Sequence, residues 1–537
     1  MSTVFSTVNQ EIGAVSTLTA NARYQKDPLA VFQTLSKDKS NTILLESAQI
    51  DDKRQLKSLL LTHAAVRIEC FGLQVTMKSL SVNGNSAIAF AQDKLSALAD
   101  CQRDGDTLTI TFSATDSDVD ELARLKAPNA MQALRIFNQL RNETHHPLAS
   151  FLGGVFAFDL MAIAEDLPAV DMAENTCPDY VYYLAENLVV IDHEKRTTEI
   201  ISQVFSGPEQ QKCYFEASRR LSELKQLLSE PITASLTPLT DTTTQPAEVK
   251  VDISDSDFCQ IVDDLKENIK AGDIFQVVPS RTFSMACKHP ITSYALLKQS
   301  NPSPYMFYLK DQDFVLFGAS PESALKYQQQ SRQVELYPIA GTRPRGKKPN
   351  GEVSLDLDSR IELELRQDQK ELAEHIMLVD LARNDIARVS QGGTRHVADL
   401  LKVDRYSHVM HLVSRVCGNL KLDLDALHAY QACMNMGTLS GAPKVKATSL
   451  IRDVEQKRRG SYGGAVGYLT GEGDMDTCIV IRSAFVKDEM AHVQAGAGVV
   501  FDSIPQSEAD ETRQKAQAVI GALSQASSFD LVMEQQS

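Results

Sequence analysis

The stretch Met436-Gly-Thr-Leu-Ser-Gly-Ala-Pro-Lys444 has the composition of a loop that leads into a helix. Gly437 and Gly441 allow the backbone to approach a ligand closely, and Ser440 can cap a helix whose first turn contains Pro443. The free N–H groups of that first turn, next to the final lysine, can hold a carboxylate or a phosphate. A plain joint between a loop and a helix explains the same residues, so both interpretations stay open.

The residues after this stretch have the pattern of a helix with one apolar face. An apolar residue recurs at helical spacing at Ala447, Leu450, Ile451 and Val454. The pair Arg458-Arg459 comes just before Gly460, which is a typical helix end. We therefore expect this helix to continue as far as the arginine pair.

Three segments that follow predict strands or tight loops. They are Tyr462–Gly467, Thr477–Val486 and Gln494–Gly498. In the second segment the alternation of a strand would place Arg482 on one face with Val480 and Ala484. A helix should then start near Ser503 and Pro505. The order of these segments is more informative than any one of them.

Composition limits the classes of function. A chain of 537 residues can bury a large core and should form two lobes or one large two-layer domain. The net charge of −16 argues against a nucleic acid or an anionic membrane surface as partner. The nine cysteines form no Cys-x-x-Cys pair, and no apolar run is long enough to span a membrane. We expect a cytoplasmic protein without a zinc site.

The chain divides into three parts. Residues 1–230 mix helices and strands, residues 231–250 contain Thr-Asp-Thr-Thr-Thr-Gln-Pro and predict a flexible linker, and residues 251–525 carry the motifs above. A helix that begins at Ser254 and stops before Gly272 should open the last part. An acidic chain that binds an anion must concentrate its cations, and four are candidates: Arg343, Arg345, Lys444 and Arg482.

Two expected helices carry paired acids. Glu371 and Glu374 are three residues apart, as are Glu508 and Glu511. Residues at this spacing share one helix face, so each pair can present oxygen atoms to one cation. Solvated helix faces produce the same pattern, and spacing alone favours that explanation.

Taken together, these motifs resemble those of the chorismate-utilising enzymes, and most closely the large subunits of anthranilate synthase. The resemblance is strong over the C-terminal half and extends to the N-terminal half through Leu44-Leu45-Glu46-Ser47. It implies an α+β fold of two intertwined lobes, in which packed β-sheets are flanked by helices and the active cleft lies between the lobes. It also implies that residues 1–230 are a regulatory lobe and residues 251–525 the chorismate-binding catalytic domain.

The resemblance implies a catalytic role for four residues. Glu322, in Ala-Ser-Pro-Glu-Ser, matches the general acid that protonates the departing ring hydroxyl. His411 matches the group that serves pyruvate elimination, and we favour it over His408. Gln276 stands where family members that add water have a lysine base, and a neutral glutamine is compatible with ammonia. Thr438 follows the anthranilate pattern.

The resemblance also implies binding roles. The residues that match groups around chorismate are Gly341, Thr342, Tyr462, Arg482, Gly496, Ala497 and Gly498. Glu374 and Glu511 match glutamates that bind Mg²⁺, which reverses the preference from spacing alone. Ser47 and the segment Pro304-Tyr305-Met306 match the two walls of an allosteric pocket for L-tryptophan.

The expected activity is the conversion of chorismate and ammonia to anthranilate and pyruvate, the first step of tryptophan biosynthesis, with feedback inhibition by L-tryptophan. Members that make 4-amino-4-deoxychorismate typically have a lysine where this chain has Ala340, which disfavours that alternative. A catalytically inert, tryptophan-sensing protein should have lost acidic or histidine site residues, and none is lost. No Gly-x-Cys-x-Gly motif is present, so a separate glutaminase subunit should supply ammonia.

Overall fold

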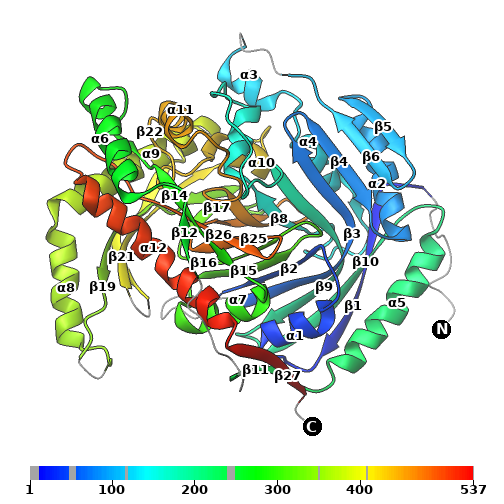
Figure 1. Cartoon of the computed structure of the whole chain (residues 1–537). Coiled ribbons are helices and arrows are strands. Elements are labelled where there is room, and N and C mark those ends of the chain that lie inside the picture. The colour runs from blue at the N-terminus through cyan, green and yellow to red at the C-terminus, as the bar shows by residue number, and fades with distance from the viewer. Residues whose placement is uncertain are drawn as a thin grey trace.

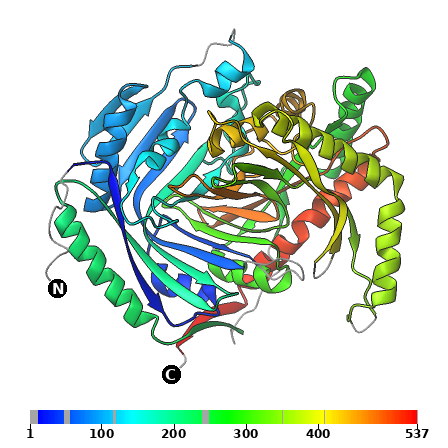
Figure 2. The same ribbon diagram turned by 180° about the vertical axis from the view of Figure 1, so that it is seen from behind.

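Antiparallel strands dominate the fold, and twenty-three of them belong to one sheet that runs through both halves of the chain (Figures 1 and 2). The computed structural model describes residues 11–47, 56–114, 119–238, 248–348, 351–406 and 409–535. Helices cover the outside of this sheet, as expected for an α+β protein. The expected fold class is confirmed.

The N-terminal half is built mainly from long strands. These strands are β1 (Ala14–Ala22), β2 (Thr42–Glu46), β3 (Lys57–Phe71), β4 (Gln74–Ser79), β5 (Asp100–Asp104), β6 (Thr107–Thr111), β7 (Arg141–Asn142), β8 (Leu152–Phe156), β9 (Tyr180–Asp192) and β10 (Thr197–Phe205). Its helices are α1 (Pro28–Ser36), α2 (Val82–Leu95), α3 (Glu121–Lys126), α4 (Gln132–Arg135) and α5 (Gln210–Leu227), with 3₁₀ helices η1 (Ile136–Gln139) and η2 (Phe158–Ile163).

The C-terminal half alternates shorter strands with longer helices. Its strands are β11 (Ile232–Pro238), β12 (Lys250–Val251), β13 (Gln276–Val277), β14 (Ser280–Ala286), β15 (Tyr305–Lys310), β16 (Val315–Ser320), β17 (Ser323–Gln328), β18 (Gln333–Leu336), β19 (Ile339–Pro344), β20 (His396–Arg405), β21 (Val409–Asn419), β22 (Gly441–Ala442), β23 (Ala465–Leu469), β24 (Met475–Ile479), β25 (Ser483–Lys487), β26 (Met490–Gly496) and β27 (Phe529–Gln535). Its helices are α6 (Asp255–Ala271), α7 (Pro290–Ser300), α8 (Leu355–Gln367), α9 (Gln369–Val389), α10 (Ala426–Cys433), α11 (Lys444–Glu455) and α12 (Pro505–Ala526).

Two strand pairings join the halves into one sheet. Strand β2 lies between β3 of its own half and β15 of the other half. Strand β8 lies between β9 and β23 in the same way. Because backbone hydrogen bonds cross at both places, the two lobes are intertwined rather than connected only by a tether.

The expected flexible linker is partly ordered. Its first residues form β11, which pairs with β27 near the C-terminus. Residues 239–247, at the centre of the Thr-rich segment, lie outside the described residues. A linker running from residue 231 was therefore wrong at its start, because β27 supplies a hydrogen-bonding partner from almost 300 residues further along the chain.

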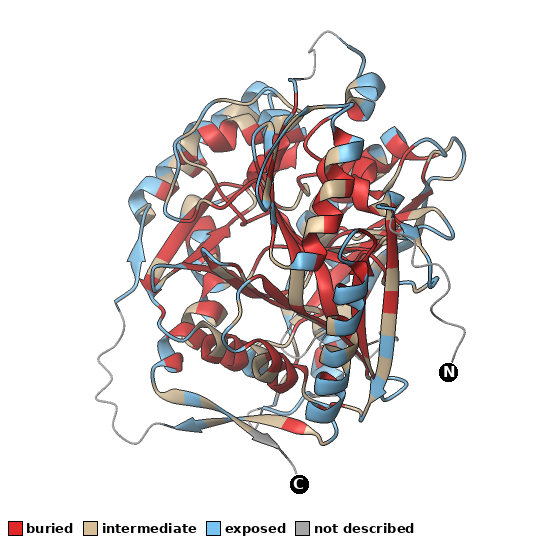
Figure 3. Ribbon diagram, turned by 90° about the vertical axis from the view of Figure 1, so that its right-hand side faces the viewer, coloured by how far each residue is buried: buried red, intermediate tan, exposed pale blue. Residues whose placement is uncertain are grey.

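Long helices of the cover have one buried and one exposed side (Figure 3), whereas all residues of the short helix α10 are buried. Helix α6 shows why: Ser254 caps its first turn, Phe258, Val262 and Leu265 are buried, and Gly272 ends it in the left-handed conformation. Helix α12 packs against α6 and α7. The sequence pattern predicted both ends of α6 correctly.

Three local expectations around the opening stretch were wrong. Helix α11 ends at Glu455, and Arg459 is buried at 2% exposure instead of ending a helix in solvent. The Ser440 hydroxyl donates to the carbonyl of Met436 and does not cap α11, whose N-cap is Pro443. The segment Thr477–Val486 is two strands, β24 and β25, separated by a turn in which Arg482 has a φ of 51°.

Candidate active site

A cleft of about 660 Å³ opens among the described residues. All the residues that line it fall between Gln276 and Lys515. The expectation of a cleft between the two lobes was therefore wrong, because the C-terminal half alone supplies its walls. The cleft contains twelve of the thirteen residues predicted to act in catalysis, substrate binding or metal binding. These are Gln276, Glu322, Gly341, Thr342, Glu374, His411, Thr438, Tyr462, Arg482, Gly496, Gly498 and Glu511.

Glu322 lies between β16 and β17, where the chain passes from one strand to the next. Its carboxyl group is buried, and the Thr438 hydroxyl donates a hydrogen bond to Glu322 Oε1 at 3.0 Å. Burial raises the pKa of Glu322 to about 8, although Thr438, Lys515 and Arg482 oppose this change. A carboxyl group that keeps its proton at neutral pH is suited to act as a general acid.

His411 lies on β21, directly opposite Thr342 on β19. Its Nδ1 atom is 2.8 Å from the Thr342 hydroxyl. Burial, together with the charge of Arg482, lowers the pKa of His411 to about 4, so the imidazole is neutral at pH 7. His408, the alternative that we disfavoured, lies outside the described residues.

Arg482 differs from the other three candidate cations. Arg343 pairs with Asp368 and Glu371, Arg345 with Asp358, and Lys444 with Asp385 at 2.6 Å. Arg482 forms no ion pair within the described ranges, and it lines the cleft.

Two conclusions follow from these contacts. Of the two interpretations left open for the start of α11, the structure favours the plain joint, because Lys444 is buried and held by Asp385 and by the carbonyl of Cys433. Arg482 was expected within a strand, but its positive φ places it in the turn between β24 and β25. Its guanidinium has no ion-pair partner in the described ranges and is therefore the group of the cleft best suited to bind a carboxylate.

Three glycines bring backbone close to the cleft. Gly341 has a φ of 84°, a conformation that other residues rarely adopt. A Cβ at Gly496 would lie 2.7 Å from the carbonyl oxygen of Pro279 and 3.0 Å from the Tyr462 hydroxyl. A Cβ at Gly498 would lie 2.8 Å from Gln276 Nε2. Ala497, the thirteenth predicted residue, is fully buried and does not line the cleft.

Four glutamates from two helices line the same cleft: Glu371 and Glu374 on α9, and Glu508 and Glu511 on α12. Burial and the charges of the other three glutamates raise the pKa of Glu374 to about 7, against the effect of Lys370. The donor set fits a hard cation such as Mg²⁺, which prefers oxygen ligands. No three of the described acidic, histidine or cysteine side chains form a ready metal site, so substrate and water would complete the coordination.

Gln276 carries an unusual orphan group. The side chain is 6% exposed and lines the cleft, and its Oε1 atom has no hydrogen-bond partner among the described residues. A buried acceptor without a partner is costly unless a ligand supplies one. Ala340 also lines the cleft, and it contributes no amine there.

Sequence reasoning missed five polar residues of the cleft: Lys370, Gln494, Ser507, Gln514 and Lys515. Lys515 Nζ lies 2.6 Å from Glu511 Oε1 and donates to the carbonyl of Gly496 at 2.9 Å. Its position four residues after Glu511 was the signal, because such residues are neighbours on a helix. Gln494 had no comparable signal, since its contact with Ser280 depends on the β14–β26 pairing.

The predicted allosteric residues lie apart from the cleft but close to one another. Glu46 of β2 is opposite Met306 of β15, and the exposed Ser47 follows Glu46 directly. Tyr305 precedes Met306 at the start of β15. The structure thus brings together two motifs that are separated by more than 250 residues.

Comparison with known proteins shows which family the chain belongs to. The family model described as chorismate binding enzyme matches residues 93–521. The chain is 56% identical to anthranilate synthase component 1 of Vibrio parahaemolyticus, over 97% of this chain and 95% of that protein. It is 54% identical to anthranilate synthase component 1 of Escherichia coli, over 95% and 97% of the two chains.

Solved structures show the same fold. Anthranilate synthase component I from Streptococcus pneumoniae superimposes with a TM-score of 0.65 at 27% identity, over 88% of this chain and 94% of that chain. The menaquinone-specific isochorismate synthase from Escherichia coli reaches a TM-score of 0.64 at 17% identity, over 96% of each chain, and supports the fold alone. The chain therefore belongs to the chorismate binding enzyme family and, within it, to the group of the anthranilate synthase component 1 proteins.

Proposed function

We propose that this chain converts chorismate and ammonia to anthranilate and pyruvate, the first step of tryptophan biosynthesis. The observation that carries the proposal is the convergence of Glu322, His411, Gln276 and Arg482 in one cleft. The relatives named anthranilate synthase component 1, which align over almost the whole chain, support the choice of reaction.

Binding begins with the carboxylates of the substrate. The Arg482 side chain is partly buried and makes no ion pair within the described ranges, and the Tyr462 hydroxyl lies beside Gly496. These two groups can hold the enolpyruvyl carboxylate by charge-assisted hydrogen bonds. A carboxylate bound there also screens His411 from Arg482, so the pKa of His411 should rise when substrate binds.

The amination step uses the Glu322 carboxyl group and the unpaired Oε1 atom of Gln276. Glu322 gives its proton to the ring hydroxyl, whose C–O bond breaks so that water leaves. Ammonia adds to the ring and loses a proton, which keeps charge and atoms balanced. Gln276 Oε1 can accept a hydrogen bond from ammonia and hold it, but an amide cannot remove a proton from water. His411 then handles the proton that moves in pyruvate elimination.

Glu374 and Glu511 would hold Mg²⁺ in this proposal. The ion would bind the ring carboxylate and withdraw electron density from the ring. Its charge would also relieve the repulsion among the four glutamates, which in its absence helps to raise the pKa of Glu374.

Regulation and partners complete the proposal. L-tryptophan would bind between Ser47 and Pro304-Tyr305-Met306 and favour a less active state. A separate glutaminase subunit would deliver ammonia.

The nine cysteines are all unpaired, which fits work in the reducing cytoplasm. None of the helices in the described ranges has both the length and the apolar character to cross a bilayer.

The test is fluorescence of anthranilate from purified chain, chorismate and Mg²⁺ with two nitrogen sources. Ammonium should support turnover that increases with pH as free ammonia increases, whereas glutamine should support none until a glutaminase is added. Absence of anthranilate with ammonium would refute the proposed reaction. Sustained turnover with glutamine alone would refute the proposed division of labour.

A further inference from the structure

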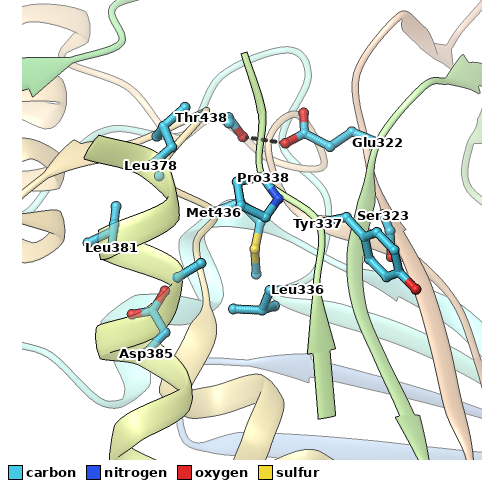
Figure 4. A pocket seen from close by; sticks show the side chains of 12 residues that line it. Glu322, Ser323, Leu336, Tyr337, Pro338, Leu378, Leu381, Asp385, Met436 and Thr438 are labelled. Atoms are coloured by element: carbon cyan, nitrogen blue, oxygen red, sulfur yellow. Dashed lines mark hydrogen bonds between the residues drawn. The ribbon is translucent and has the colours of Figure 1, made fainter. Parts of the chain in front are cut away.

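A second, smaller cavity adjoins the cleft at Glu322 (Figure 4). It is lined by α9, by the chain around the end of β18 and by the segment Met436–Thr438. Glu322, Leu378 and Thr438 line both this cavity and the main cleft. The hydrogen-bonded pair of Glu322 and Thr438 is therefore shared by two cavities.

The size of the second cavity limits its ligand. Its volume is about 30 Å³, and a water molecule needs a cavity of roughly 10–15 Å³. One or two water molecules fit, and a substrate of the size of chorismate does not. Most of the wall is apolar, as Leu336, Pro338 and Leu381 show in Figure 4. The Glu322 carboxyl group provides a polar partner for water, and the Asp385 carboxylate, which is paired with Lys444, also belongs to the lining.

The bonding of Glu322 leaves a place for water. Thr438 donates to Oε1, and no hydrogen bond to Oε2 comes from the described part of the chain. Gln276, the proposed ammonia site, lines the main cleft but not the small cavity. The small cavity therefore contacts the proposed acid, Glu322, and does not contact the proposed ammonia site.

The proposed amination requires that a proton return to Glu322 after each turnover. Each amination leaves Glu322 as a carboxylate, because its proton departs with the ring hydroxyl as water. The ammonium group formed on the ring releases one proton to solvent, which balances the loss. Glu322 must regain a proton before the next turnover, and a route outside the main cleft would return that proton while product is still bound.

We propose that the small cavity is a water site through which a proton returns to Glu322 behind the bound substrate. This inference rests on the proposed function of Glu322 as general acid. Filling the cavity should slow the return of the proton without changing how chorismate binds. The raised pKa of Glu322 favours its reprotonation at neutral pH by water alone.

Ala382 offers a direct test. It is 7% exposed on α9 and lines the cavity, so Ala382→Val adds two methyl groups there. Leu381→Phe fills the same space from a partly exposed position and replaces the first variant if that one fails to fold. Ala387→Val is the matched control, because Ala387 is exposed on the same helix and lines neither cavity.

The measurements are kcat and KM for chorismate loss, in H₂O and in D₂O. The filled variants should lose at least about tenfold in kcat, a part of the ~10²–10⁴-fold contribution of general acid catalysis. Their solvent isotope effect should increase, and KM should stay within about twofold of the parent value. Ala387→Val should behave as the parent.

Two results would overturn the inference. The first is a folded filled variant with the kcat and isotope effect of the parent. The second is a loss that appears only in KM, which would show altered packing of the cleft. Glu322→Gln separates the two levels of the argument, since full activity in that variant would refute the acid itself, and not only the water site.

Discussion

At the scale of single residues, burial determines the chemistry of the cleft more than the spacing of charges does. Glu322 and His411 both become neutral at pH 7, one by gaining and one by losing affinity for a proton. Residue identity could be predicted from sequence because both stand in distinctive motifs. Their protonation could not, because it depends on neighbours such as Thr438, Lys515 and Arg482 that arrive from other elements.

The raised pKa of Glu322 predicts a pH profile. Glu322 is protonated below about pH 8 and loses its proton above it. At a constant concentration of free ammonia, kcat should therefore be level up to about pH 8 and decrease about tenfold per pH unit above it. Glu322→Gln should lower kcat by about 10²–10⁴-fold and abolish this decrease. Thr342→Val, which changes a different hydrogen bond, should retain the decrease, and a profile independent of pH in the parent would contradict the assignment.

His411 should affect the second half of the reaction more than the first. His411→Met should slow pyruvate elimination by roughly 10²–10⁴-fold, because no imidazole is left to move the proton. Amination should suffer less, so an aminated intermediate should accumulate. Chromatography of stopped reactions measures this, and equal slowing of chorismate loss and anthranilate formation would contradict the division of steps.

At the scale of elements, the cleft depends on pairings that sequence periodicity does not reveal. Helices α6 and α12 followed from their apolar faces and end signals, but the break between β24 and β25 did not. The local sequence favours one continuous strand there, but the chain changes its pairing partner: β24 pairs with β17, and β25 pairs with β16. Arg482 stands at this change of partner, and its orientation is a tertiary effect.

Arg459 shows how one buried charge supports several elements. Its guanidinium donates to Glu455 and to the carbonyls of Leu439 and Val278, two residues that line the cleft. Arg459→Ala would leave Glu455 buried without its cation, so the free energy of unfolding should decrease by about 3–5 kcal/mol. Urea denaturation measures this change. The exposed Arg513→Ala should cost far less, and an equal cost for both would contradict a buried supporting role.

The β2–β15–β16 pairing offers a route from the proposed tryptophan site to the acid. Tyr305 lies opposite Ser320, only two residues before Glu322. Ser47→Arg should occupy the site and relieve inhibition by tryptophan while catalysis is largely kept. A tryptophan titration of activity measures it, with Ser96→Ala, an exposed residue at the end of α2, as a control on another element. An unchanged inhibition curve for Ser47→Arg would contradict the placement.

At the scale of the whole molecule, one sheet carries both proposed functions. The cleft lies in the C-terminal half, and the N-terminal half joins it through the β2–β15 and β8–β23 pairings and through Asn175, which donates a hydrogen bond to Gln494 of the cleft. The α+β class and the intertwining of the lobes could be predicted, because the motifs resemble those of a family whose fold has both features. The position of the cleft and the pairing of β11 with β27 could not, since both depend on long-range contacts that leave no local pattern.

The identity of the product tests the central claim most directly. Purified chain should be incubated with chorismate, Mg²⁺ and ammonium, and all products separated by chromatography and identified by mass. With Gln276 in place of a lysine base and Ala340 in the cleft, the account predicts anthranilate and pyruvate in equal amounts. Isochorismate or 4-amino-4-deoxychorismate as the main product would contradict it.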